Sequence, residues 1–224
     1  MSHYALAVFC DRQNDEAFFD LLTPYSENNE DEFVFVPVSD EEIKKEWVDF
    51  KKNNPSWTPA NWLKDSYHYD KKTDRFGNYY NPHGYYDYYT IDGRDCGAEL
   101  KNGVEWKRRF RKSDYDWFRK PSDEDVEDYE KQWETYSKDG DGWYKAEYYQ
   151  ENYKTKEQYV KEMTRPWIPY AFVTPDGVWH APGRVGWFAM SDDTAETRDK
   201  YWQEWTDFIN NAPDCYVSIF DCHI

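Results

Sequence analysis

The two ends of the chain are apolar on both faces of an expected β-strand. Residues 3–10 read HYALAVFC and residues 215–224 read CYVSIFDCHI, which is apolar on both faces up to Asp221. A strand with two apolar faces must be covered on both sides, and only a central strand of a sheet meets that condition. We therefore predict that these two strands are neighbours in the centre of one sheet.

Strand and helix signals between the two ends do not alternate strictly. The order reads β-α-β, an insertion, a β-hairpin, a helical insertion, a second β-hairpin, an α-helix and a β-strand. A doubly wound parallel sheet requires regular alternation, so we expect an α+β fold with a mostly antiparallel sheet. We predict one domain over residues 1–224, with the first and last strands central and helices packed on one face. An irregular aromatic insertion is expected at about 51–84 and a helical insertion at about 113–164.

The composition restricts the classes of partner and compartment. A formal net charge of −17 repels phosphates and argues against direct binding to nucleic acid or to a membrane surface. Aromatic residues make up 21% of the chain, so the core must be built largely from Trp, Tyr and Phe rings. We expect no membrane span, because no apolar run approaches roughly 20 residues. We expect no signal peptide, because the apolar run at residues 3–10 is short and no basic region precedes it. The scattered cysteines predict neither a zinc site nor a disulfide framework, and they suit a reducing cytoplasm.

The stretch from residue 79 to residue 103 concentrates tyrosines beside one arginine. Tyr86 and Tyr88 favour a strand, and residues 91–94 (IDGR) are typical of a turn in which glycine takes a positive φ. We expect a β-hairpin or a pair of short strands here. A guanidinium beside tyrosine rings can hold a phosphate while the rings stack on a flat ligand. The alternative is an aromatic sheet face in which Arg94 pairs with a neighbouring aspartate.

A histidine and an aspartate share one face of the last expected strand. Asp221 and His223 are two residues apart and therefore project from the same side. An aspartate that orients a histidine is found in catalytic triads and in metal sites, but no nucleophile elbow and no H-x-x-x-H pair accompanies them. A distributed metal site would use His83, His180, Asp221 and His223. The alternative is a polar cluster that completes the end of the strand.

Two local patterns favour structural roles. Residues 107–112 (KRRFRK) form a basic run before an expected helical segment, 121–164, which holds 13 acidic and 6 basic residues. We expect the run to be neutralised within the protein or to lie at a solvated strand edge. Residues 137–142 (SKDGDG) resemble the start of a calcium loop, but position 12 falls on Tyr148, where a bidentate Glu is needed. We therefore expect a plain turn.

Four separated motifs together resemble a family of bacteriophage and prophage proteins without an assigned activity. Members read N-P-x-x-x-W-D-W-Y-x-I-G-G-R-W-x-G, which residues 81–97 resemble, and they begin S-H-Y or N-H-Y, like residues 2–4. They carry T-P-Y-A and then W-x-x-x-G-x-x-G-W, similar to residues 168–171 and 179–187. They end D-C-H-I, identical to residues 221–224. The resemblance implies a phage accessory protein made in the cytoplasm of a bacterial host, with counter-defence as its role.

This chain departs from the family pattern inside the tyrosine-rich stretch. Tyr86 and Tyr88 stand where members have Trp, and Asp95-Cys96 follow Arg94 in place of Trp. Asp92 replaces a glycine, and its negative charge beside Arg94 weakens an anion site at that position.

Our leading hypothesis is a counter-defence binding protein that sequesters a small nucleotide-like host signal, without a cofactor, metal or catalytic residue. Aromatic rings would stack on bases and arginines would hold phosphates, with His223 beside them. The predicted ligand-binding residues are Tyr86, Tyr88, Arg94, Trp179, Arg184, Trp187 and His223. The first alternative is an acidic inhibitor that imitates DNA toward a basic host defence protein, and the second is a metal-dependent hydrolase. The oligomeric state is left open, with a homo-oligomer as one option.

Overall fold

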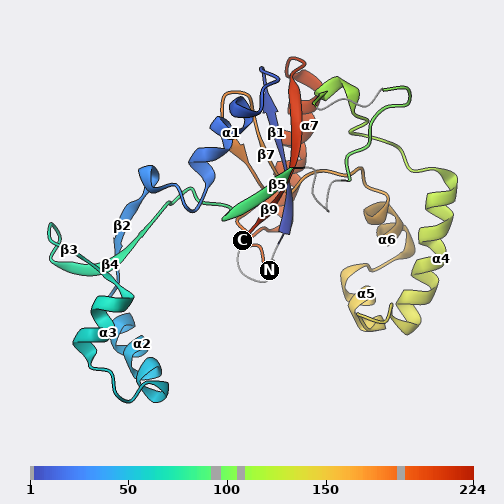
Figure 1. The fold of residues 1–224 in the computed structure, drawn as a ribbon. Helices are drawn as coiled ribbons and strands as arrows, with labels where there is room; N and C mark the ends of the chain where they lie inside the picture. The colour runs from blue at the N-terminus through green and yellow to red at the C-terminus, as the bar shows by residue number, and fades with distance from the viewer. Residues whose placement is uncertain (1–2, 92–96, 105–108, 186–189) are drawn as a thin grey trace.

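The main sheet of the protein is mixed and has six strands in the order β5-β9-β1-β7-β8, with β6 also paired to β9. The computed structural model describes residues 3–91, 97–104, 109–185 and 190–224 (Figure 1). The strands of this sheet are β1 (His3–Cys10), β5 (Tyr88–Ile91), β6 (Phe110–Arg111), β7 (Ala171–Val173), β8 (Trp179–His180) and β9 (Tyr216–His223).

Strands β1 and β9 pair along their whole length in the middle of this sheet. They run antiparallel, with His3 opposite His223 and Cys10 opposite Tyr216. The prediction that the first and last strands are central neighbours is confirmed. The β1–β7 pair is parallel and the other pairs of the sheet are antiparallel. The predicted α+β class with a mostly antiparallel sheet is therefore also confirmed.

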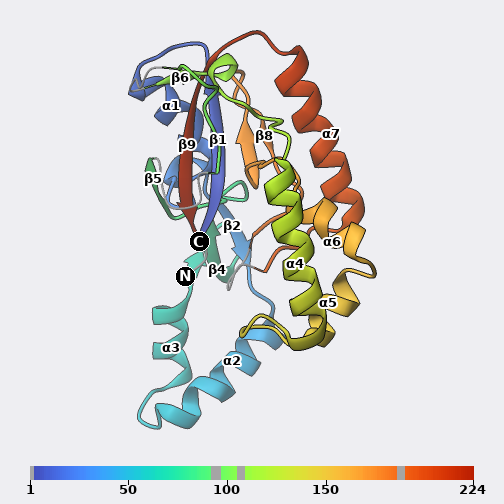
Figure 2. The same cartoon turned by 90° about the vertical axis from the view of Figure 1, so that its right-hand side faces the viewer.

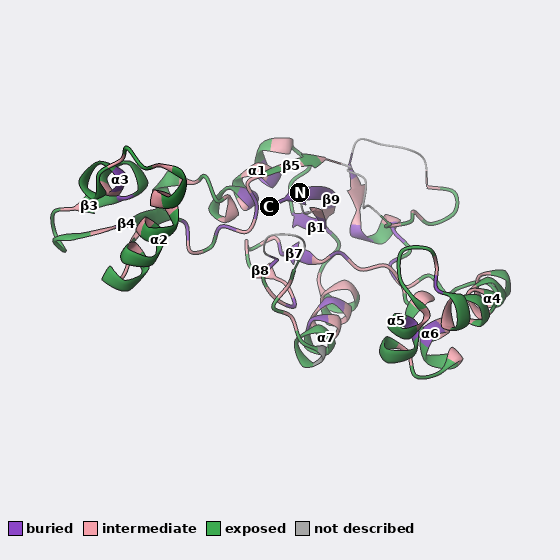
Figure 3. Ribbon diagram, turned by 90° about the horizontal axis from the view of Figure 1, so that it is seen from below, coloured by how far each residue is buried: buried purple, intermediate pink, exposed green. Residues whose placement is uncertain are grey.

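Helices cover both faces of the main sheet, whereas we expected them on one face. Helix α1 (Asp15–Leu22) packs Phe18 into a cluster with Leu6 and Val8. Helix α7 (Ala195–Asn211) packs Trp205 into a second cluster with Phe9. Leu6 and Val8 project from the opposite side of β1 to Phe9, because side chains alternate along a strand. Figures 2 and 3 show α1 and α7 on opposite sides of β1 and β9.

In the residues that the structure describes, the tyrosine-rich stretch does not form the expected hairpin or pair of short strands. Residues 92–96, which hold most of the expected turn at 91–94, lie outside the described residues. Strand β5 of this stretch pairs antiparallel with β9, which lies far away in sequence. The residues before it, in β4 (Arg75–Tyr80), belong to a second sheet. Apolar residues of β5 and β9 share the core on the α1 side, as in the contact between Tyr89 and Phe220. Long-range packing therefore decided the pairing of β5.

A second, three-stranded sheet with two helices extends from one side of the main sheet, and we call residues 34–80 the sheet arm (Figure 1). Its elements are β2 (Val34–Pro37), α2 (Asp40–Asn53), α3 (Pro59–Ser66), β3 (His68–Asp70) and β4. Rings of Trp47, Phe50 and Trp62 pack against one another. The irregular structure that we expected at about 51–84 was wrong for residues 59–80, where α3, β3 and β4 form beside this ring cluster.

A three-helix excursion extends from the opposite side, and we call residues 123–163 the helical arm (Figures 1 and 3). It consists of α4 (Asp123–Asp139), α5 (Ala146–Asn152) and α6 (Lys156–Met163). These helices lie within the range of the predicted helical insertion. Short 3-10 turns complete the fold at η1 (Thr23–Tyr25), η2 (Glu30–Glu32) and η3 (Lys112–Asp114). Among the described residues, no helix has the length and apolar character to cross a membrane.

The described residues of the basic run make contacts within the protein. Arg109 is buried and its guanidinium lies 2.7 Å from Asp15. The Lys112 ammonium donates to backbone carbonyls at the C-terminal end of α7, including Ile209 at 2.9 Å. Positive charge at a helix C-terminus is favourable because carbonyl groups there lack partners within the helix. The positive charges of these two residues are therefore balanced by contacts within the protein, as we expected.

Candidate functional site

Two histidine–aspartate pairs meet at one end of the central strands. His3 on β1 lies opposite His223 on β9, and His223 lies opposite Tyr88 on β5. Asp221 projects from the same face of β9 as His223, as the two-residue spacing predicts. Asp87 precedes β5 and donates its backbone N–H to the His223 carbonyl at 3.0 Å. We call His3, Asp87, Tyr88, Asp221 and His223 the histidine cluster.

Each imidazole of the histidine cluster is held at Nδ1 by a carboxylate. His3 Nδ1 lies 3.1 Å from Asp221 Oδ1, and His223 Nδ1 lies 2.7 Å from Asp87 Oδ1. The two rings meet edge to face, with centroids 5.1 Å apart and planes at 75°. A carboxylate at Nδ1 fixes the orientation of an imidazole and leaves Nε2 as the atom for external contacts.

Burial differs sharply within the histidine cluster. His223 is 6% exposed and Asp221 is 8% exposed, whereas Tyr88 is 46% exposed. The Tyr88 ring stacks on the His223 ring with centroids 4.3 Å apart and planes at 17°. Nε2 of His223 is buried and has no hydrogen-bond partner among the residues that the structure describes. A buried polar atom of this kind is unfavourable unless a partner reaches it.

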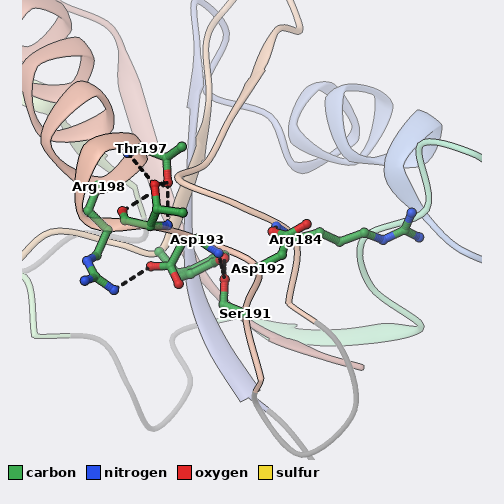
Figure 4. Close-up of polar contacts among 8 residues, drawn as sticks. Arg184, Ser191, Asp192, Asp193, Thr197 and Arg198 are labelled. Atoms are coloured by element: carbon green, nitrogen blue, oxygen red, sulfur yellow. Dashed lines mark hydrogen bonds and ion pairs between the residues drawn. The ribbon is translucent and has the colours of Figure 1, made fainter.

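A second group of side chains, the aromatic stack, lies on the other face of the sheet and consists of Tyr25, Tyr85, Trp179 and Arg184. Tyr85 stacks on Trp179 at 4.7 Å, and Tyr25 packs on Trp179 at 4.9 Å. The Arg184 guanidinium lies 5.6 Å from the Tyr85 ring and donates to the Gly84 carbonyl at 2.7 Å. Figure 4 shows the Arg184 side chain extending away from the ion pair of Asp193 and Arg198. The Trp179 ring is therefore packed against two tyrosine rings rather than left open to a ligand.

Segment 84–88 joins the aromatic stack to the histidine cluster, and Glu27 lies beside both. Glu27 donates its backbone N–H to the Tyr86 carbonyl at 2.8 Å. Loss of hydration raises the pKa of the Glu27 carboxyl, Arg184 opposes that rise, and Asp87 adds to it. Glu27 is therefore an acidic neighbour of both groups, and its position in a loop gave no sequence signal.

The structure brings together only some of the predicted ligand-binding residues. Tyr88 and His223 meet in the histidine cluster, and Trp179 and Arg184 meet in the aromatic stack. Tyr86 is 3% exposed and donates its hydroxyl to the Leu22 carbonyl at 2.9 Å, so its ring belongs to the core. That position does not leave the Tyr86 ring open to a ligand. Arg94 and Trp187 lie outside the described residues.

Sequence reasoning did not select His3 or Asp87 as site residues. His3 became part of the cluster only through its register opposite His223 on β9. Each of them lies inside one of the four sequence motifs described above, at residues 2–4 and 81–97. Three of the four motifs therefore converge at this end of the sheet.

The four residues of the expected distributed metal site, His83, His180, Asp221 and His223, do not come together in the structure. His180 stacks on Phe172 at 4.5 Å and lies 3.2 Å from Glu204 rather than joining His223. His83 is exposed in the turn after Asn81. Over the described part of the chain, no group of three or more His, Cys, Asp or Glu side chains is arranged to hold a metal ion. The distributed metal site was therefore wrong, because His83 and His180 belong to other parts of the fold.

A cavity of about 620 Å³ lies between α6 and the N-terminal half of α7. Its lining includes Lys161, Arg165, Tyr170, Arg198 and Trp202, and none of the five described candidate residues. Arg165 and Arg198 are already paired, with Glu162 at 3.1 Å and Asp193 at 3.2 Å. The cavity is therefore distinct from the histidine cluster.

Comparisons with family models, with curated proteins and with solved structures found no match to this chain.

Proposed function

We propose that the protein is a phage-encoded counter-defence protein that binds a small nucleotide-like ligand at the histidine cluster. The observation that carries this proposal is the Tyr88 ring, which is supported on one face by His223 and is 46% exposed. An exposed ring on a rigid support is suited to stacking on a nucleobase, because every base presents a flat π-face. A host immune signal built from nucleotides is the ligand class that fits this role.

The imidazoles supply the polar part of the proposed site. The His3 side chain is 25% exposed and is oriented by Asp221, so its free edge is accessible at the rim. His223 offers a buried Nε2 that has no partner in the described part of the chain. Imidazole nitrogens exchange hydrogen bonds with the polar groups of a ligand. Arg184, at the far end of segment 84–88, is exposed and retains further N–H groups beyond the one bonded to Gly84.

The test is calorimetry of the purified protein against a panel of cyclic and linear nucleotides. Tyr88→Ala removes the exposed ring, and Tyr88→Phe keeps it. Tyr69→Ala is the matched control, because Tyr69 is 50% exposed on β3 of the sheet arm. Binding that Tyr88→Ala abolishes and Tyr69→Ala preserves would support the proposal. Absence of binding across the panel, or binding unchanged by Tyr88→Ala, would contradict it.

A second candidate function is an acidic inhibitor that binds a basic host defence protein. The observation that favours it is the first part of α4, where Asp123, Glu124, Glu127 and Asp128 are exposed. These carboxylates lie on the helical arm, and Figure 1 shows that this arm stands apart from strands β1 and β9 of the main sheet. Charge of this kind steers association with a basic surface, and the salt-dependence test in the Discussion addresses it.

A further inference from the structure

The turn between α4 and α5 is held in one conformation by the Asp141 carboxylate. Asp141 Oδ1 accepts hydrogen bonds from the backbone N–H groups of Trp143 and Tyr144, at 2.9 and 2.7 Å. Asp141 Oδ2 accepts from the Tyr149 hydroxyl at 2.6 Å. Gly140 has φ +77°, and a Cβ there would lie 2.2 Å from the Tyr144 carbonyl oxygen, so the position requires glycine. The turn is therefore built without using the Trp143 side chain.

Trp143 projects from this turn with 93% of its surface exposed. Tyr144 and Tyr148 beside it are 54% and 40% exposed and stack on each other at 4.3 Å. The core of the helical arm is made by other rings, including the contacts of Trp133 with Tyr159 and of Tyr136 with Tyr149. An indole that is almost fully in water adds little apolar burial to the fold, and such rings are enriched at binding surfaces.

The charge of the helical arm selects the kind of partner. Segment 121–164 holds 13 acidic and 6 basic residues, a net charge of −7. Nucleic acid and anionic lipid surfaces are repelled by this charge, and a second copy of a chain with net charge −17 is repelled as well. A basic protein surface is the complementary occupant, because opposite charge accelerates encounter and suppresses wrong partners.

We propose that the turn at residues 140–145, called here the Trp143 turn, anchors a docking surface for a basic protein, with the indole entering an apolar pocket of that partner. A pre-organised turn lowers the entropy lost on binding, and a central Trp is the commonest kind of binding hot spot. Figure 1 shows the turn at the end of α4, next to α5 and away from the main sheet, where a partner can approach it. The proposal is independent of ligand binding at the histidine cluster. It adds an anchor beyond the C-terminal end of α4 to the acidic residues of the second candidate function, which lie in the first part of that helix.

The experiment begins with the full chain immobilised and exposed to a bacterial cell extract. The retained protein is identified by mass spectrometry, purified, and titrated against wild type, Trp143→Ala, Trp143→Phe and the control Tyr69→Ala. We expect a basic partner whose Kd rises at least about tenfold with Trp143→Ala, rises less with Trp143→Phe and is unchanged with Tyr69→Ala. Circular dichroism of each variant verifies that the arm remains folded.

Kinetics separate the role of the indole from that of the charge. Trp143→Ala should act mainly on the dissociation rate, whereas Glu124→Lys with Glu127→Lys should lower the association rate and its salt dependence. Tyr88→Ala should change neither rate, so failure of nucleotide binding does not affect this result. Retention of no protein, a partner that is not basic, or an affinity unchanged by Trp143→Ala would each overturn the proposal.

Discussion

His3 and His223 face each other across the central antiparallel strands, with ring centroids 5.1 Å apart, although 218 residues separate His3 from the Asp221 that holds it. The contact places the first and last elements of the chain in one polar cluster. Because both strands are anchored in the core on each side of the sheet, the two imidazoles are positioned by the most buried part of the fold.

Replacing the carboxylate that holds His223 should lower stability modestly. Asp87→Ala removes the acceptor at His223 Nδ1, and a lost hydrogen bond at a buried group costs about 1–3 kcal/mol. We expect the lower end, about 1 kcal/mol, because the Asp87 side chain is 37% exposed and water can replace it. Urea denaturation of the variant and of the control Asp20→Ala measures the difference. An equal effect of the two substitutions would show that the Asp87 contact contributes nothing specific.

The two tyrosines of the family-like motif should respond in opposite ways. Tyr86→Ala removes a buried ring and should lower the free energy of unfolding by about 3–5 kcal/mol. Tyr88→Ala should change stability by less than about 1 kcal/mol, because its ring is exposed and stacks on His223 at the surface. Thermal and urea unfolding of both variants provide the measurement. Similar losses for the two would contradict the assignment of Tyr86 to the core and Tyr88 to the surface.

Ligand affinity should depend on the Tyr88 ring rather than on its hydroxyl. Stacking of one base on an aromatic side chain is worth about 1–3 kcal/mol, which corresponds to roughly a fivefold to 150-fold increase in Kd for Tyr88→Ala. Tyr88→Phe should stay within about threefold of wild type. Calorimetry with the nucleotide that binds most tightly gives these ratios. A large loss with Tyr88→Phe would point to a hydroxyl contact instead of stacking.

The Trp143 turn should open in acid. Hydrogen bonds from the Tyr144 backbone and the Tyr149 hydroxyl lower the pKa of the Asp141 carboxyl below its ordinary value. A depressed carboxyl pKa means that the ionised group stabilises the folded turn, so this stability is complete above the ordinary pKa and is lost as pH falls through the depressed one. Hydrogen exchange in residues 140–149, corrected for intrinsic rates, should show less protection at pH 2 than at pH 5. In Asp141→Asn the difference between the two pH values should largely disappear.

Binding to a basic host protein, if the acidic surface carries function, should weaken steeply with salt. Exposed charges are screened beyond about 10 Å at 0.1 M ionic strength. Reversal of the six acidic residues across 123–130 should abolish that binding. Reversal of the three acidic residues of η2, before β2, should weaken it much less, and this variant tests whether acidic charge elsewhere on the chain is sufficient. If counter-defence activity in infected cells survives the reversal across 123–130, the hypothesis of an acidic inhibitor is wrong.

The sequence determined the centre of the fold, because a strand that is apolar on both faces must lie in the interior of a sheet. The apolar pattern of residues 3–10 and 215–224 was sufficient to make β1 and β9 central neighbours. The two-residue spacing of Asp221 and His223 likewise placed them on one face. These are local properties, and a periodicity of two residues is read directly from the chain.

Only the tertiary structure decided which partners those strands meet. The pairing of β5 with β9 and the division of α1 and α7 between two faces depend on contacts between segments far apart in the chain. Tyr86 and Tyr88, two residues apart, would share a face if the strand continued through both. Tyr86 instead bridges to Ser26 before β5 begins, so its ring enters the core while Tyr88 remains at the surface beside His223. A bend at Asp87, between the Tyr86 bridge and the start of β5, separates the two rings.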